Sequence, residues 1–255
     1  SEMCIRDSNY RDRQGTFKKT DFESLTGRFD ISQSMFDNKL TADMSAIISE
    51  HTMPRSWNTY IYRQAMIHNP TEPVRNEDGS WYERDLYFYD NPVSYLNETV
   101  GELKRKNQRL SASLTFRPIE SVTLKGMYAR RGTSTTDGVY HTKQHVNSTK
   151  NGKNGDAYRK DSDFRNNLIE LTANWSQTFN KHNFNALIGY NYEDNMNSYL
   201  EVSNYDFPTD AYTYDKIEAG MALQRGEATM NSYKSTDKLI GLFARIGYNL
   251  SLIHI

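Results

Sequence analysis

Two histidines four residues apart are the first residues in this chain whose type and spacing could do chemistry. His141 and His145 lie in the stretch YHTKQHVN, and histidine nitrogens are common zinc ligands. A zinc site needs further ligands, and no Glu or Cys accompanies this pair. The stretch is polar, so a solvated loop is the favoured interpretation, and we expect no metal site.

A second candidate is the acidic stretch NEDGSW at residues 76–81. Its acidic residues and glycine are typical of a calcium loop, but the later bidentate Glu of such a loop is missing, which favours a plain turn. The chain has no Ser–His–Asp ordering, nucleophile elbow or glycine-rich phosphate loop. We therefore expect no catalytic residues, no cofactor and no enzymatic activity.

Aromatic residues are concentrated in a long polar region at residues 51–107. Flat aromatic faces beside polar side chains suit a sugar or an aromatic-rich protein interface. An equally weighted alternative is that these rings form the small core that a long loop needs to stay ordered. The candidate ligand-binding or partner-binding residues are Trp57, Tyr60, Tyr62, Trp81, Tyr82 and Tyr87.

Composition limits the class of protein. Hydrophobic residues make up 36 % of the 255 residues and aromatic residues 13 %, so the chain is polar but not typical of a disordered one. The formal net charge of −1 gives no electrostatic case for nucleic acid as a partner. No stretch approaches the roughly 20 apolar residues of a transmembrane helix, which leaves transmembrane strands open.

The elements that must position these residues are strands. Apolar and polar residues alternate in seven stretches, the last of which is DKLIGLFARIGYNL at residues 237–250. Such alternation is typical of strands with one apolar face. Each stretch spans about 9–12 residues, close to the ~9–11 residues that a tilted transmembrane strand requires.

The connections between these stretches alternate in length. Three of them are short, at residues 36–39, 117–120 and 179–182, and three are long, at residues 51–107, 132–164 and 195–235. Short turns at one end and long loops at the other are typical of outer-membrane barrels. We therefore predict an all-β fold, an antiparallel meander of about seven strands that belongs to a larger transmembrane β-barrel.

In such a barrel the apolar face meets outer-membrane lipid and the polar face lines the lumen. The residues expected to face the lumen are Arg28, Asp30, Asp43, Lys125, Arg245 and Asn249.

The two ends of the chain differ in character from the rest. SEMCIRDS at residues 1–8 and the end of LSLIHI, residues 251–255, look like translated sequencing-adapter read-through. We expect both to be non-native tails around a partial β-barrel at residues 9–250. The alternative is a genuine short N-terminal tail and a genuine strand end.

Several blocks of the chain resemble one family in its order. They are NYRDRQGTFKKTDFESLTGRFDISQSMFDNKL, IHNPTEPVRNEDGSWYE with NPVSYLNET, TFNKHNFNALIGYNYED and SYKSTDKLIGLFARIGYNL. Together they resemble SusC/RagA-type TonB-linked transporters of the bacterial outer membrane. The resemblance implies a barrel with many more strands, a plug, a SusD-like lipoprotein lid and import of oligosaccharides or peptides. It also implies energy from the TonB complex, which would act through regions that we expect to be absent from this chain.

Two other functions compete with a fragment of an active transporter. One is a passive porin-like outer-membrane barrel, which a plug-encoding region upstream in the gene would argue against. The other is a soluble, β-rich carbohydrate-binding or adhesin module, with the loop aromatics as its site. Partition into membrane or buffer would separate that module from a barrel.

Overall fold

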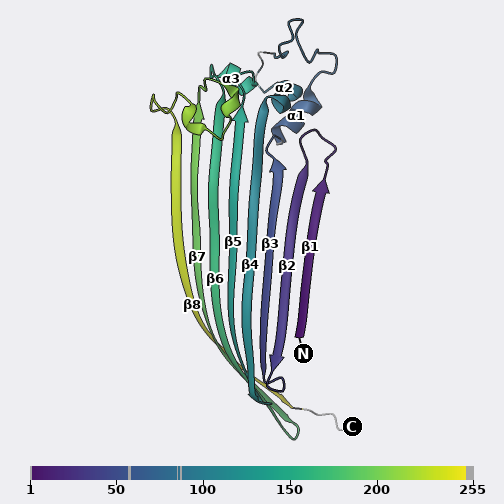
Figure 1. The fold of residues 1–255 in the computed structure, drawn as a ribbon, viewed down its shortest axis with the longest axis vertical. Helices are drawn as coiled ribbons and strands as arrows, with labels where there is room; N and C mark the ends of the chain where they lie inside the picture. The colour runs from purple at the N-terminus through teal and green to yellow at the C-terminus, as the bar shows by residue number, and fades with distance from the viewer. Residues whose placement is uncertain (1, 57–58, 85, 87, 251–255) are drawn as a thin grey trace.

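Eight antiparallel strands form one sheet in the computed structural model, which describes residues 2–56, 59–84, 86 and 88–250. The strands lie side by side in chain order, so the sheet is a meander (Figure 1). They are β1 (Glu2–Arg13), β2 (Phe22–Met35), β3 (Leu40–Pro54), β4 (Thr99–Ile119), β5 (Val122–His141), β6 (Asp156–Phe179), β7 (His182–Tyr205) and β8 (Thr229–Leu250). The predicted all-β antiparallel meander is confirmed.

The predicted number of about seven strands is one too low, because β1 was not expected. It pairs with β2 from Glu2 opposite Gln33 to Arg13 opposite Phe22. Its sequence, EMCIRDSNYRDR, carries little apolar alternation. Backbone pairing with β2 makes it a strand, and that pairing does not depend on side-chain pattern. The non-native origin of residues 1–8 stays a prediction.

The strands are also longer than the alternating stretches. They range from 12 residues in β1 to 24 in β6 and β7. The long connections shrink accordingly to residues 55–98, 142–155 and 206–228. The reason is that strand pairing continues toward the long-loop end through segments that are mostly polar, where regular alternation is lost.

Short turns join the strands at the opposite end, as predicted. Residues 36–39 join β2 to β3, with Phe36, Asp37 and Asn38 at φ values of 55°, 54° and 63°. The Lys39 amide donates to the Phe36 carbonyl oxygen at 3.0 Å and closes this turn. Positive φ values match the twist of tight hairpins, and Asn and Asp tolerate them better than most residues.

The two faces of the sheet differ in chemistry. Paired residues of neighbouring strands point to the same side, as do alternate residues along a strand. By this register one face, the apolar face, carries Ile31, Met44, Leu114, Leu171 and Leu242. Leu242 is 82 % exposed, and no second layer of described residues covers this side. The other side is the polar face.

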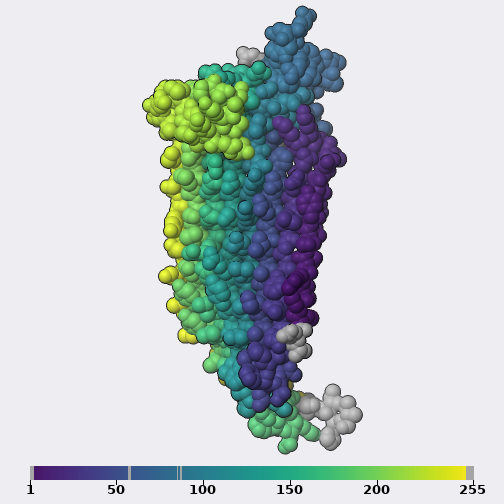
Figure 2. All heavy atoms as spheres, viewed as in Figure 1, coloured from purple at the N-terminus to yellow at the C-terminus, as the bar shows by residue number. Residues whose placement is uncertain are grey.

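The buried core lies in the loops and not under the sheet. α1 (Thr59–Ile67), α2 (Pro92–Asn97), α3 (Val146–Lys150) and the short helices η1 (Asp210–Tyr212) and η2 (Ile217–Ala219) gather at the long-loop end. Figure 2 shows this cap as two masses, one from residues 55–98 and one from residues 206–228. Two apolar clusters lie at this end of the sheet. One consists of Ile61, Tyr95, Leu96 and Val146, and the other of Tyr140, Ala157 and Phe207. None of the described helices is both long and apolar enough to cross a membrane.

Candidate functional site

All six residues that the sequence assigns to a lumen share the polar face. Asp30 pairs with Ser45 and Asp43 with Ser113. Along the same face the register continues through Lys125 opposite Thr172, Thr172 opposite Gly189 and Gly189 opposite Phe243. Arg245 and Asn249 follow Phe243 at alternate positions of β8, and Arg28 precedes Asp30 on β2.

Hydroxyl groups surround the two carboxylates of this face. The Ser45 hydroxyl donates to Asp30 at 2.6 Å. Ser32 and Ser113 donate to the two oxygens of Asp43 at 2.7 and 3.2 Å. Small hydroxyl side chains beside partly exposed carboxylates make a hydrophilic surface, as expected of a wall that meets water.

Glycines of β7 and β8 accommodate large side chains on the same face. A Cβ atom at Gly189 would lie 2.1 Å from the ring of Phe243, so the ring lies flat over this glycine. In the same way Asn191 lies over Gly241, with 2.0 Å between its Oδ1 and the position of an added Cβ. Sequence reasoning did not find these pairs, because only the register shows which glycine faces which side chain.

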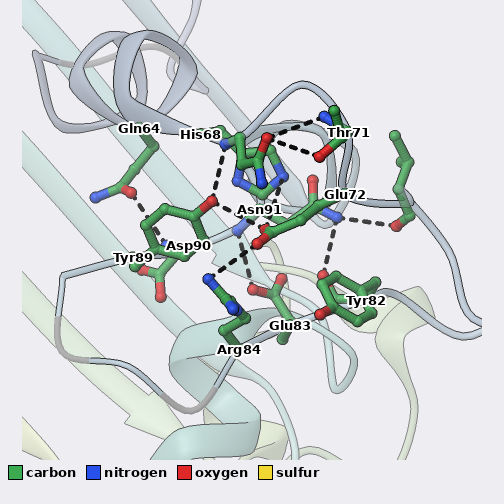
Figure 3. A network of polar contacts seen from close by, with 12 residues as sticks. Gln64, His68, Thr71, Glu72, Tyr82, Glu83, Arg84, Tyr89, Asp90 and Asn91 are labelled. Atoms are coloured by element: carbon green, nitrogen blue, oxygen red, sulfur yellow. Dashed lines mark hydrogen bonds and ion pairs between the residues drawn. The ribbon is translucent and has the colours of Figure 1, made fainter.

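A polar network organises the first mass of the cap (Figure 3). At its centre, buried Asp90 accepts hydrogen bonds from the Tyr60 hydroxyl and, at 2.6 Å, from the Lys150 ammonium group. Its backbone amide donates to the Gln64 side chain at 3.0 Å. Burial, reinforced by Asp90, raises the pKa of the Tyr60 hydroxyl. α1, α3 and the segment before α2 are thus tied together by one carboxylate.

The adjacent Asn91 caps α2. Its side-chain oxygen accepts from the amides of Val93 and Ser94 at 3.0 and 3.3 Å, and Pro92 begins the helix. The Asn91 side-chain amide donates to the carbonyl oxygens of Val74 and Tyr82 at 2.9 and 3.1 Å. Sequence reasoning missed this residue, although Asn before Pro at a helix start is a recognisable capping signal.

Glu72 holds together another part of this network (Figure 3). Its carboxylate forms an ion pair with Arg84 at 2.9 Å and accepts a hydrogen bond from the Tyr89 hydroxyl at 2.9 Å. The Tyr89 oxygen in turn accepts from the Asn69 amide at 2.8 Å, and its ring stacks on His68 with 5.2 Å between centroids. These contacts hold the loop between α1 and α2 in one conformation.

The predicted aromatic binding residues differ in their contacts and exposure in the structure. Tyr60 packs against Tyr95 with 5.7 Å between ring centroids, and the Trp81 indole nitrogen donates to Glu98 at 2.7 Å. Both contacts support the alternative in which the rings order the loop. Tyr82 is half-buried and Tyr62 is 50 % exposed. Trp57 and Tyr87 lie outside the described residues, and a binding role for any of the six stays a prediction.

The predicted solvated loop around the two histidines is wrong. The rings of His141 and His145 stack at 4.1 Å, and His145 is fully buried. The amide of Asn147 donates to His145 Nδ1 at 3.0 Å, so His145 caps α3. Burial lowers the pKa of His145 far below its ordinary value. A ring that caps a helix and packs on Tyr95 is buried despite the polar sequence around it.

Two further points concern ion binding. Within the described part of the chain, no group of three or more His, Cys, Asp or Glu side chains could hold a metal ion. The acidic stretch at residues 76–81 forms the plain turn that was predicted, closed by the Gly79 amide donating to the Asn76 carbonyl oxygen at 3.0 Å. The Asp78 carboxylate accepts the Ser80 amide at 2.9 Å within this turn.

A long meander with one exposed apolar face, one polar face and loops gathered at one end has the architecture of a membrane β-barrel wall. Comparison with solved structures agrees. Of this chain, 98 % superposes on 28 % of one chain of the RagAB peptide transporter, with a TM-score of 0.77 and 13 % identity. For the RagAB importer in its closed-closed state the TM-score is 0.76 at 12 % identity, over 98 % of this chain and 29 % of that one. At these identities the match shows the fold.

The sequence itself has a relative of the same kind. It is 22 % identical over 225 residues to the TonB-dependent receptor P3 of Formosa agariphila, which is 88 % of this chain and 22 % of that receptor. No family model matches the chain. The chain is a homologue of the TonB-dependent receptors, which reside in the bacterial outer membrane. It spans about a quarter of the length of the proteins it matches.

Proposed function

We propose that this chain contributes wall and outer loops to a TonB-dependent transporter that imports peptides or oligosaccharides. The observation that carries the proposal is the fold match, which extends over 98 % of the chain at a TM-score of 0.77. The solved transporter of that match is named as a peptide importer, which favours peptides. Oligosaccharides remain the second substrate class, because aromatic and polar loop side chains suit both.

In this proposal the apolar face meets lipid and the polar face lines the passage. Asp30, Asp43 and Arg245 would then face water or a plug, and no residue of this chain would change the substrate chemically. Energy would come from the TonB complex through parts of the protein outside this chain. The wall would supply a rigid, hydrophilic surface, since its backbone groups are paired strand to strand.

The cap would form the outer entrance. Long loops of outer-membrane barrels lie on the extracellular side, and both masses of the cap lie at that end (Figure 1). We propose that the cap contacts a SusD-like lipoprotein and the incoming substrate. Tyr62 is the described candidate aromatic side chain most available for such contact.

The orientation of the wall is testable with adjacent residues. Arg245 and Ile246 follow each other on β8 and face opposite sides. In the full-length transporter with all other cysteines replaced, a charged maleimide should label Arg245→Cys in intact outer membranes and leave Ile246→Cys unlabelled. Labelling of both positions at similar rates would contradict the proposed orientation.

Transport itself needs a second experiment. Cells that lack the full-length gene should lose uptake of labelled peptides or oligosaccharides, and wild-type uptake should stop when the TonB complex is removed. Uptake that persists without the TonB complex would instead favour the passive porin.

A further inference from the structure

On β4 to β6 the apolar face ends at a boundary halfway up the sheet. Its apolar belt runs on β4 to β8 from the turn end to Leu110, Tyr128, Ile169, Tyr192 and Ile240. Beyond it, the same side of β4 to β6 carries mainly charged and polar residues, whereas β7 and β8 also carry Met196, Leu200, Val202 and Met230 there. A strand of 24 residues rises about 80 Å, far more than the ~30 Å of a hydrocarbon core. The upper part of the sheet therefore lies beyond the lipid tails in the proposed orientation.

A hollow of about 290 Å³ lies just above this boundary, centred on Gly132 of β5. Gly132 pairs with Gln108 on one side and with Arg165 on the other. Arg130 and Ser134 are its neighbours on the same strand and face. Since glycine has no side chain, the floor of the hollow is backbone, and an added Cβ would find its nearest atom 3.9 Å away.

Three cationic side chains line this hollow, from three different strands: Lys106, Arg130 and Arg165. Arg130 is exposed and has no ion pair or side-chain hydrogen bond to any described residue. Arg165 Nε is buried and has no hydrogen-bond partner among the described residues. A donor that is shielded from water and unpaired is costly unless a ligand satisfies it.

Two acidic residues near the hollow are already engaged. Asp163 itself lines the hollow, and its carboxylate accepts a hydrogen bond from the Ser134 hydroxyl at 2.5 Å. Glu50, on the neighbouring strand β3, lies 3.5 Å from the Lys106 ammonium group. The two arginines therefore keep hydrogen-bond donors without acceptors. Such donors favour an anionic ligand with several acceptor oxygens.

We propose that this hollow binds the phosphate headgroup of an outer-leaflet glycolipid. The floor at Gly132 admits a phosphate between the two guanidinium groups, and the lipid tails would continue down over the apolar belt. Tyr128, the belt residue next to Arg130, has its ring on this face and its hydroxyl hydrogen-bonded to Asn167 at 3.3 Å, as suits an interfacial aromatic residue. The proposal rests on the orientation given under Proposed function.

The test uses the full-length transporter in detergent, titrated with bisphosphorylated lipid A and followed by native mass spectrometry. Reversal of both charges in Arg130→Glu/Arg165→Glu should weaken binding about tenfold or more, because each cation near an anionic lipid surface contributes about 1 kcal/mol. Gly132→Glu should weaken it too, by filling the hollow with a carboxylate. Arg109→Glu is the matched control on the polar face, opposite Arg131, and should bind as the wild type does.

The possible outcomes separate the lipid proposal from the proposed function. Dephosphorylated lipid A should bind no better to the wild type than to the charge-reversed variant. Equal binding of bisphosphorylated lipid A by all variants would overturn the site, and so would displacement of the lipid by millimolar inorganic phosphate, which would assign the hollow to free phosphate. Folding of each variant is checked by heat-modifiable gel mobility. If the variants still partition into membranes, a failed titration leaves the barrel orientation intact.

Discussion

The sheet and the cap solve the burial of apolar side chains in opposite ways. In the cap, Ile61 is 0 % exposed and contacts other apolar residues of the same chain. In the sheet, Ile246 is 85 % exposed, and no described residue covers it. The cap is built like a soluble protein, with an apolar core and buried polar residues such as Asp90 and Asn91 that are hydrogen-bonded. In the proposed orientation the apolar face of the sheet meets lipid, which takes the place of a core.

The largest effect should come from the cap core. Ile61→Ala removes a fully buried side chain, and large-to-small core changes of this kind cost about 2–5 kcal/mol. We expect hydrogen exchange of amides in α1 and α2 to speed up accordingly, while exchange in the sheet is unchanged. Met66→Ala on the same helix, 70 % exposed, is the control and should leave exchange in the cap as it is.

A charge on the apolar face tests the other half of the comparison. Ile246→Arg should lower the free energy of unfolding in lipid vesicles by about 2–4 kcal/mol, because this residue lies near the middle of the apolar belt and an arginine near the bilayer midplane is costly. Leu239→Arg, on the polar face opposite Glu193, should cost much less. Equal costs for the two variants would mean that the apolar face does not meet lipid.

Acid should loosen the cap before it affects the sheet. Burial lowers the pKa of His145, so the unfolded loop binds a proton below about pH 6.5 that the folded loop does not bind. Stability contributed by neutral His145 is therefore complete above that pH and is lost as the pH falls, by at most about 1.4 kcal/mol for each pH unit. Proteolysis of residues 142–155 should rise below pH 6.5, and His145→Asn, which keeps a capping side chain, should remove this dependence.

The smallest effect is expected on the polar face. Ser45→Ala removes the 2.6 Å hydrogen bond to Asp30, and water in a lumen can replace the lost donor. We expect a loss of about 0.5–1 kcal/mol in the free energy of unfolding. A loss above about 2 kcal/mol would indicate that Asp30 is sealed from water, which would contradict a lumen-lining position.

The sheet was more predictable from the sequence than the cap. Alternation at Ile240, Leu242 and Ile246 indicates both the strand and its apolar face, because a period of two places these side chains on one side whatever surrounds them. The same rule predicted the shared face of Asp43 and Arg245, which lie on strands distant in the chain. It failed for β1 and for the upper halves of β4 to β8, where most residues on both faces are polar and the alternation is interrupted.

The cap was hardly predictable, because its order depends on contacts between segments distant in the chain. Asp90 joins Tyr60 and Lys150, and nothing in the local sequence of any of the three residues indicates the other two. His145 looked like a solvated residue and is buried by Tyr95 and His141. The hollow at Gly132 is a similar case, since its cations come from three strands that only the register aligns.

The sequence by itself determined the class of fold, the strand periodicity, the turns at one end and which side of each alternating stretch is apolar. These properties follow from local geometry and from the chemistry of neighbouring residues. The tertiary structure alone decided the eighth strand, the extension of the sheet beyond its apolar belt, the contacts of Tyr60 and Trp81 in the cap and the group of cations around Gly132. Those features arise from contacts between segments that are distant in the sequence, and no single stretch of the chain predicts such contacts.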